Sequence, residues 1–374
     1  MAKIHIALVG GQPAPVYKGI IDEQPDKVVL VYSKDSLEQA NSVEKLACRK
    51  IDTLKCDKVQ MDTVSIAEMK EKIEEIAGNL DKEAQVTINL SGGPKVWSIL
   101  FYDRFMKIAR CICLDQNDNK FDFSSRQATK IKAKLDISDT LELNNITSIG
   151  MRLSDYTKED FQAVQTVREM RKLSVANFNK LMKQTEDRPE IKYWYIDAWN
   201  YLSWDKDSNT FTMSISNKWS KKTKDICSPN VKKVVLNTGW FELEVAKLLS
   251  EWVQPQHIAM NCKLRSSKNI DGPILNEIDI IIEIKGKLLF VECKTQIKDA
   301  TDIDKFHNAV RTYGGLSAKG IFFTDAVMRG QAKAKCDLAG IPTFSMQEIK
   351  KTGNEGKKEL FGKLRELIGG LNIR

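Results

Sequence analysis

Two carboxylates and a lysine in the C-terminal half of the chain have types and a spacing suited to phosphate chemistry. Asp279 is followed thirteen residues later by Glu292, and Lys294 comes two residues after Glu292. The apolar stretches 278–284 and 288–291 predict two strands joined by a tight turn. Side chains alternate along a strand, so Glu292 and Lys294 face the same way, and a two-residue turn sets Asp279 opposite Glu292.

Carboxylates that lie directly opposite each other on paired strands repel, so this arrangement requires a compensating charge. A divalent metal, which prefers hard oxygen ligands, is the simplest candidate. The ammonium group of Lys294 suits an anionic substrate. The alternative is an ordinary amphipathic hairpin with a solvated face, but Ile281 and Phe290 share that face, and solvated faces seldom carry both.

The predicted elements around this pair occur in a recognisable order. They are a helix over 240–253, strands over 257–264, 275–284 and 288–295, a helix over 302–313 and a strand over 320–324. With Asp279 and the Glu292-x-Lys294 motif, this order resembles the core of the PD-(D/E)xK restriction-endonuclease-like nucleases. The proline of that motif is absent, and Asn276–Glu277–Ile278–Asp279 takes its place.

The resemblance implies a metal-dependent nuclease. Asp279 and Glu292 would hold Mn²⁺ or Mg²⁺, with the carbonyl of Cys293 as a third ligand. Lys294 would orient or deprotonate the attacking water, or stabilise the charge on the phosphate. Glu277 is a weaker candidate for the metal site, because the register places it across from Lys294. On the following helix, Lys305 and Arg311 could hold the substrate backbone, although ordinary surface charge is the favoured interpretation.

A fourth catalytic group is expected from the helix over 240–253, where Glu242 and Glu244 compete. Glu242 shares helical spacing with a stripe of apolar residues, namely Ala246, Leu249 and Val253. Glu244 lies above the polar Lys247 and Glu251. We therefore choose Glu242, and the run Trp240–Phe241–Glu242 is similar to the W-L-E pattern of the family.

The N-terminal half alternates short apolar strands, at 3–10, 27–33 and 86–90, with amphipathic helices. This alternation predicts a mostly parallel, doubly wound sheet, whose ligands bind beyond the carboxyl ends of the strands. Gly10–Pro15 follows the first strand. Asn89–Lys95 follows a later strand and opens a helix over 96–109, with Pro94 expected at the first helical position.

Both segments could bind phosphate, since glycines permit close approach and a helix N-terminus attracts anions. The alternative is a tight turn with a helix cap and no ligand. A Rossmann-like domain with a Gly-Gly-x-Lys loop, fused to a PD-(D/E)xK core, resembles the CRISPR-associated Rossmann fold (CARF) nucleases of type III CRISPR antiviral defence. The resemblance covers about residues 1–125 and 235–350.

This second resemblance implies a homodimer that binds a cyclic oligoadenylate, usually cyclic tetra-adenylate, across its two CARF domains. Binding would activate cleavage of single-stranded RNA or DNA. The implied ligand contacts are Gly11, Gln12, Ser91, Gly92, Gly93 and Lys95, with Ser33 as a weaker candidate. Two other functions stay open: a sensor or regulator without significant nucleic-acid cleavage, and an enzyme that degrades the cyclic messenger in its own CARF pocket.

The predicted fold class is α/β, with an N-terminal Rossmann-like CARF domain over 1–125 and a C-terminal PD-(D/E)xK nuclease domain over 233–374. A small mixed, largely helical connecting region is expected over 126–232. Its aromatic clusters are Tyr193–Tyr195 and the set Trp199, Tyr201 and Trp204; core packing is favoured over base stacking. The lysines of 218–233 form either a solvated linker or a contact with a nucleic-acid backbone.

Composition narrows the remaining classes. The 374 residues carry a net charge of +8, which permits nucleic-acid binding without requiring it. No apolar stretch is long enough for a signal peptide or a membrane span, so a cytoplasmic protein without a membrane partner is expected. Eight cysteines lack a C-x-x-C pair and three histidines are far apart, which argues against a zinc site or a disulfide framework.

Overall fold

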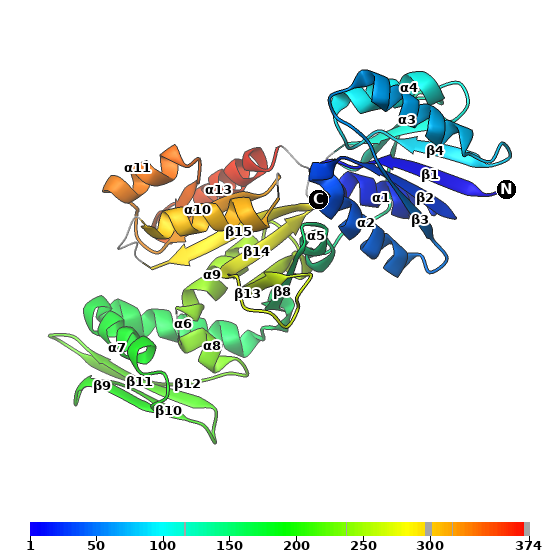
Figure 1. The fold of residues 1–374 in the computed structure, drawn as a ribbon. Coiled ribbons are helices and arrows are strands. Elements are labelled where there is room, and N and C mark those ends of the chain that lie inside the picture. Colours follow the sequence, from blue (N-terminus) through cyan, green and yellow to red (C-terminus); the bar gives the residue numbers. More distant parts are fainter. Residues whose placement is uncertain (116, 237, 296–300, 316, 370–374) are drawn as a thin grey trace.

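The computed structural model describes residues 1–115, 117–236, 238–295, 301–315 and 317–369, and it contains three sheets (Figure 1). The chain begins in the N-terminal seven-stranded sheet and ends near the six-stranded sheet, while the four-stranded sheet lies at the other end of the molecule. The fold is mixed α/β, as predicted. Among the described residues, no helix is long and apolar enough to cross a bilayer.

The N-terminal sheet has the order β3-β2-β1-β4-β5-β6-β7. The first five strands in this order are parallel, and the last two are antiparallel additions. The bounds are β1 Lys3–Leu8, β2 Lys27–Tyr32, β3 Lys55–Gln60, β4 Gln85–Asn89, β5 Arg110–Leu114, β6 Asn119–Asp122 and β7 Gln127–Lys130.

Helices cover both faces of this sheet, which confirms the doubly wound arrangement. Helices α1 (Pro13–Glu23) and α2 (Leu37–Lys50) pack on one face. Helices α3 (Ile66–Gly78) and α4 (Lys95–Phe105) pack on the other. Helix α4 therefore begins at Lys95, and Pro94 is its N-cap rather than its first helical residue. The small shift arises because ψ of Pro94 is 147°, an extended value that the helix does not use.

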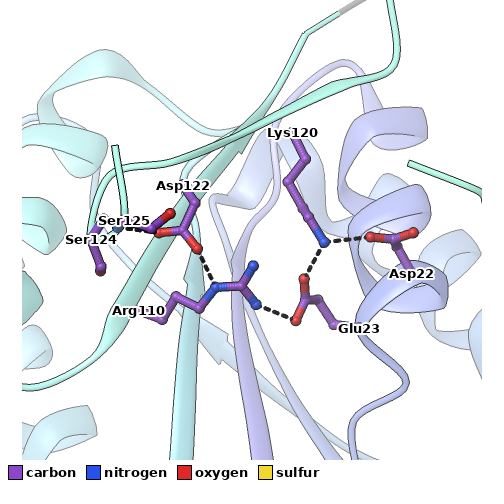
Figure 2. Close-up of polar contacts among 7 residues, drawn as sticks. All are labelled: Asp22, Glu23, Arg110, Lys120, Asp122, Ser124 and Ser125. Carbon is purple, nitrogen blue, oxygen red and sulfur yellow. Dashed lines mark hydrogen bonds and ion pairs between the residues drawn. The ribbon is translucent and has the colours of Figure 1, made fainter. Parts of the chain in front are cut away.

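A network of ion pairs joins the C-terminal end of α1 to strands β5 and β6 (Figure 2). Arg110 donates to Asp122 at 2.5 Å and to Glu23 at 2.7 Å. Lys120 donates to Asp22 at 2.6 Å and to Glu23 at 2.7 Å. The network fixes α1 to the sheet by its C-terminal end, while its N-terminal end follows the Gly10–Gln12 loop.

The C-terminal sheet has the order β17-β16-β15-β14-β13-β8. The strands are β8 Ile146–Arg152, β13 Ile258–Ser266, β14 Asn276–Ile284, β15 Lys287–Lys294, β16 Lys319–Thr324 and β17 Thr343–Ser345. The accompanying helices are α5 Ile137–Leu143, α9 Gly239–Leu249, α10 Thr301–Tyr313, α11 Gly330–Leu338, α12 Met346–Thr352 and α13 Asn354–Leu367. Helix α9 packs on one face of the sheet, and α10 packs on the other.

Residues 126–232 contribute to all three sheets. Strand β7 extends the N-terminal sheet, and β8 pairs with β13 at the edge of the C-terminal sheet. The rest forms helices α6 (Lys158–Leu173), α7 (Val175–Asp187) and α8 (Val231–Val235), together with an antiparallel sheet in the order β12-β11-β10-β9. Its strands are β9 Tyr193–Asp197, β10 Asn200–Asp205, β11 Thr210–Ser216 and β12 Lys221–Cys227.

Candidate active site and ligand-binding loops

The β14–β15 hairpin sets the carboxylates opposite each other through its turn. Ile284 pairs with Lys287 and the register runs back to the pair of Ile280 with Val291. Lys285 (φ 52°) and Gly286 (φ 85°) both have left-handed backbones, as a type I′ two-residue turn requires. One further step along the ladder brings Asp279 opposite Glu292, the register that the sequence predicts.

Two contacts fix these side chains at the open end of the hairpin. The backbone N–H of Cys293 donates to Oδ2 of Asp279 at 2.7 Å. Lys294 Nζ lies 2.7 Å from Oε1 of Glu292, as expected for side chains two residues apart on one face of a strand. Strand β13 bulges beside them: Asn261, which would face Asp279, has a φ of 52°, and the β13–β8 register shifts between Met260 and Lys263.

Glu242 on α9 belongs to the same group of charges. Its side chain is buried, and its Oε2 atom has no hydrogen-bond partner among the described residues. Its other oxygen lies 3.5 Å from the hydroxyl of Thr238. Glu244 is committed elsewhere, because it forms ion pairs with Arg168 and Lys350. The competition between the two glutamates thus resolves in space: Glu242 faces the carboxylates and Glu244 does not.

The electrostatics of this cluster disfavour ionised carboxylates. Burial, followed by the charge of Glu292, raises the pKa of Asp279 to about 7. Burial and then the charge of Asp279 raise the pKa of Glu242, and burial raises the pKa of Glu292 although Lys294 opposes this. Burial alone would lower the pKa of Lys294, but the charges of Glu292 and Asp279 outweigh it and raise this pKa.

The donor set suits a hard divalent cation. Three carboxylates interact here with raised pKa values, and one buried oxygen lacks a partner. Carboxylate oxygens are the ligands that Mg²⁺ and Mn²⁺ prefer. In the described parts of the chain, no three His, Cys, Asp or Glu side chains converge closely enough to hold an ion as they stand. The fit therefore rests on ligand chemistry and on the orphaned oxygen of Glu242.

A basic cleft of about 470 Å³ adjoins this group. Glu277 lines it, exposed and in register with Lys263 rather than pointing to the carboxylates. Lys232 and Lys233 of α8 line it as well, so two of the lysines from the basic segment lie beside the site. Sequence reasoning missed Lys263; the pairing of β13 with β14 was the available signal, since it sets Lys263 against Glu277.

The two lysine and arginine candidates on α10 lie elsewhere. Lys305 is exposed on the helix surface. Arg311 lines a different cavity, of about 530 Å³, together with Gly11 and Asn144 at the boundary with the N-terminal domain. Neither residue lines the basic cleft.

The two glycine-rich loops of the N-terminal domain touch each other beyond the ends of β1 and β4. A Cβ atom added to Gly10 would lie 2.7 Å from the backbone N of Gly93, and one added to Gly92 would lie 2.2 Å from the carbonyl of Leu8. Glycine is required there because the backbones themselves are in contact. Gly11 and Gln12 are exposed beside α1, and Lys95 is exposed at the start of α4.

The two serine candidates are occupied within the fold. The Ser91 hydroxyl donates to Oδ1 of Asn89 and accepts from the backbone N–H of Leu114 at 2.8 Å. Ser33 accepts no ligand-like contact of its own but joins Ser36 in a capping turn, with 2.9 Å between Ser33 N and Ser36 Oγ. The glycine backbones and Lys95 are therefore better placed than these hydroxyls to meet a ligand.

The N-terminal domain also rests on the turn of the β14–β15 hairpin. Lys18 of α1 is buried and donates to Asp118 at 2.7 Å and to the carbonyl of Lys285 at 3.1 Å. A Cβ atom on Gly286 would lie 3.0 Å from that of Ala14. The same α1 thus borders the Gly11–Gln12 loop at its start and holds the hairpin turn one helical turn later.

Comparisons with known proteins place this geometry in context. Residues 4–145 match the family model described as the Card1 CARF domain. The protein VC1899 from Vibrio cholerae superposes with a TM-score of 0.73, 14% identity and coverage of 98% of this chain and 99% of the other. Can2 from Sulfobacillus thermosulfidooxidans, solved with cyclic tetra-adenylate, gives 0.69, 16%, 98% and 99%.

A third similar structure is described as a type III CRISPR defence DNA nuclease activated by cyclic oligoadenylate. Its TM-score is 0.54 at 15% identity, covering 95% of this chain and 52% of the other. A search of curated proteins gave no match. At these identities the structural similarities establish a shared fold over nearly the whole chain.

Proposed function

From a chain whose residues 4–145 form a CARF domain, we propose a metal-dependent endonuclease that cyclic tetra-adenylate activates by binding across a homodimer. Its substrate would be single-stranded RNA, single-stranded DNA or both, and its role antiviral defence. The observation that carries the proposal is the convergence of Glu242, Asp279, Glu292 and Lys294 at one end of a hairpin whose turn rests on the CARF domain.

In this proposal each side chain of the cluster has a definite task. Asp279, Glu292 and the carbonyl of Cys293 would hold Mn²⁺ or Mg²⁺, which supplies polarisation of the scissile phosphate and a more acidic bound water. Lys294, kept charged by its acidic neighbours, would orient that water or stabilise the five-coordinate phosphate. Glu242 would complete the site with its unpartnered oxygen. Lys232 and Lys263 in the adjacent cleft would hold substrate phosphates.

The ligand would bind at the carboxyl ends of β1 and β4, where two glycine-rich loops and the start of α4 meet. A helix N-terminus and exposed glycine backbones favour phosphate, and Lys95 adds a positive charge. Apolar side chains are exposed at the same end of the domain, with Val64 85%, Ile66 54% and Ile99 66% accessible. They support a dimer, in which a two-fold symmetric ring could contact both subunits.

The hairpin offers a route from ligand to active site. A shift of the Gly11–Gln12 loop would move the start of α1, whose Lys18 holds the carbonyl of Lys285. Strands are stiff along their length, so a displacement of the turn would be felt at Asp279 and Glu292 at the other end. Ligand binding could in this way bias the position of the carboxylates without any direct contact.

The test is cleavage of labelled single-stranded RNA and DNA by the full chain, with and without cyclic tetra-adenylate, in Mn²⁺, Mg²⁺ or chelator. We expect cleavage only with ligand and metal together. Asp279→Asn should abolish it, whereas Glu251→Gln, a surface carboxylate paired with Lys357, should not. Ligand binding without cleavage in any metal would instead indicate a sensor, and loss of the intact ring would indicate a messenger-degrading enzyme.

A further inference from the structure

The aromatic residues of the four-stranded sheet divide between its two faces. Trp194, Trp204 and Phe211 are buried and pack with one another, with Trp204 and Phe211 ring centroids 4.5 Å apart. Helices α6 and α7 cover that face (Figure 1). The other face carries Tyr193 and Tyr195, which are 50% and 61% exposed. Core packing, the interpretation favoured from the sequence, thus accounts for the first face and leaves the second unexplained.

The exposed rings form a continuous surface, here called the aromatic face (Tyr193, Tyr195, Trp199 and Tyr201). The register pairs Tyr195 with Tyr201 across β9 and β10. Ring centroids of Tyr193 lie 5.9 Å from Tyr195 and 5.7 Å from Tyr201, the latter stacked at 28°. Trp199, in the turn between the strands, is 58% exposed, and its carbonyl accepts from Ser214 of β11. The rings are therefore held in place by the sheet before any partner arrives.

Positive charge borders the aromatic face. Lys221 Nζ lies 4.6 Å from the centre of the Trp199 ring, and Lys218 Nζ lies 4.9 Å from that of Trp219, which is 84% exposed. The hairpin from 217 to 224 has four lysines and no acid. The nearest carboxylates are already engaged: Asp225 accepts from Thr212 at 2.6 Å, and Asp197 accepts from Asn200 and the backbone of Trp199.

We propose that the aromatic face and its lysines bind single-stranded nucleic acid, at a site separate from the metal-binding carboxylates. Exposed aromatic rings beside cations match a strand whose unpaired bases can stack and whose phosphates need neutralisation. A duplex would offer its phosphates but keep its bases inside, so the rings would be unused. The inference extends the proposed nuclease with a second contact for its substrate, yet it stands without cleavage activity.

The experiment measures binding by fluorescence anisotropy of labelled oligouridylate and oligothymidylate of about 20 nucleotides, long enough for a stacking site. The full-length protein is used in chelator without cyclic oligoadenylate, so that no cleavage occurs. Replacing Tyr195 and Trp199 together by alanine should weaken binding by about fivefold to a hundredfold for each ring that stacks a base. Tyr195→Phe should bind like the wild type, because the ring remains.

Charge and topology controls sharpen the result. Lys221→Ala should make the salt dependence shallower by about 0.7 logarithmic unit per phosphate released, while Lys72→Ala on α3 should not. Phe121→Ala, an aromatic residue 41% exposed on β6, should leave affinity unchanged. Duplex of the same length should bind equally to the wild type and to the alanine double variant.

Wild-type affinity of the Tyr195→Ala, Trp199→Ala variant for single strands would overturn the inference, as would an equal loss for duplex. A change in oligomeric state of that variant, seen by sedimentation, would show that the face contacts a second chain instead. Failure of the proposed nuclease is distinguishable: it would appear as absent cleavage with these binding differences still present.

Discussion

At the scale of single residues, the cluster around Asp279 combines like charges with partial burial. Fold energy opposes this combination, because each ionised carboxylate loses hydration and gains a repulsive neighbour. The pKa of Asp279 near 7 is the measure of that conflict. A site that is uncomfortable when empty of cation is one that a cation stabilises.

Asp279→Asn should therefore separate stability from activity. The folded-state pKa is raised, so the folded protein binds more protons than the unfolded chain between about pH 4 and 7, and wild-type stability falls as pH rises through this window. In chelator at pH 8 the variant should be more stable by on the order of 1–3 kcal/mol. The gain should vanish near pH 4, where the carboxyl is protonated in both states.

Asparagine keeps an acceptor for the N–H of Cys293, so the substitution tests charge alone. Urea denaturation at both pH values gives the comparison, and cleavage with metal should be lost. A variant less stable than the wild type at pH 8, or one that still cleaves, would contradict the role given to Asp279.

Lys294→Ala should lower turnover far more than substrate affinity, because the ammonium group acts on the water or on the developing phosphate charge. Single-turnover rates at saturating substrate report the first quantity, and anisotropy in chelator reports the second. Lys305→Ala on the surface of α10 is the matched control and should change neither. If Lys294→Ala affected affinity alone, Lys294 would be a backbone contact only.

At the scale of elements, the β14–β15 hairpin joins the two functions, because its turn rests on α1 and its open end carries the carboxylates. Lys18→Met removes both contacts that hold the turn, to Asp118 and to Lys285. We expect ligand affinity and ligand-independent cleavage to persist while the activation factor falls. Lys27→Met, which breaks the exposed pair with Asp57, is the control. Full activation of the Lys18 variant would exclude this route.

The same hairpin should respond to pH through His257. Its Nδ1 atom lies 2.9 Å from Glu283, whose other oxygen accepts from the backbone of Gly286 at 2.6 Å. The hydrogen bond and charge of Glu283 raise the pKa of His257, against desolvation and the charges of Lys134 and Arg152. Stability from this pair is present below pH 6.5 and is lost as pH rises through the folded-state pKa.

The melting temperature should thus drop between pH 6 and 8 by more in the wild type than in His257→Gln. The effect is at most about 1 kcal/mol, because solvent screens a histidine that is one-third exposed. Equal drops in the two proteins would show that the ion pair contributes nothing to stability.

At the scale of the whole molecule, ligand sensing and cleavage are expected to be separable. Lys95→Ala removes one charge-assisted contact per subunit and two per symmetric dimer. At about 1.5–3 kcal/mol each, the ligand affinity should fall by roughly two to four orders of magnitude. The activation midpoint should rise accordingly, while the maximal rate at saturating cyclic tetra-adenylate stays similar.

Titration of cleavage against ligand concentration measures both quantities. Lys107→Ala, an exposed lysine just beyond the other end of α4, should leave the curve unchanged. An unchanged midpoint for Lys95→Ala, or cleavage independent of any cyclic oligoadenylate, would refute the sensor role of the CARF domain.

The sequence by itself determined the local features. Apolar alternation and the Lys285–Gly286 turn predicted the hairpin and the register of Asp279 with Glu292, because a type I′ turn and a period of two are set by neighbouring residues. Helical spacing placed Glu242 on the buried side of α9 for the same reason. The alternation of strands and helices predicted the doubly wound N-terminal sheet.

Only the tertiary structure decided what depends on long-range contacts. It showed that Glu244 is neutralised by Arg168 and Lys350 while Glu242 keeps a free oxygen, and that the hairpin turn rests on Lys18, more than 250 residues earlier. It also divided the aromatic clusters into a buried and an exposed face. Such outcomes depend on which surfaces meet after folding, and the period of a local pattern carries no information about a distant partner.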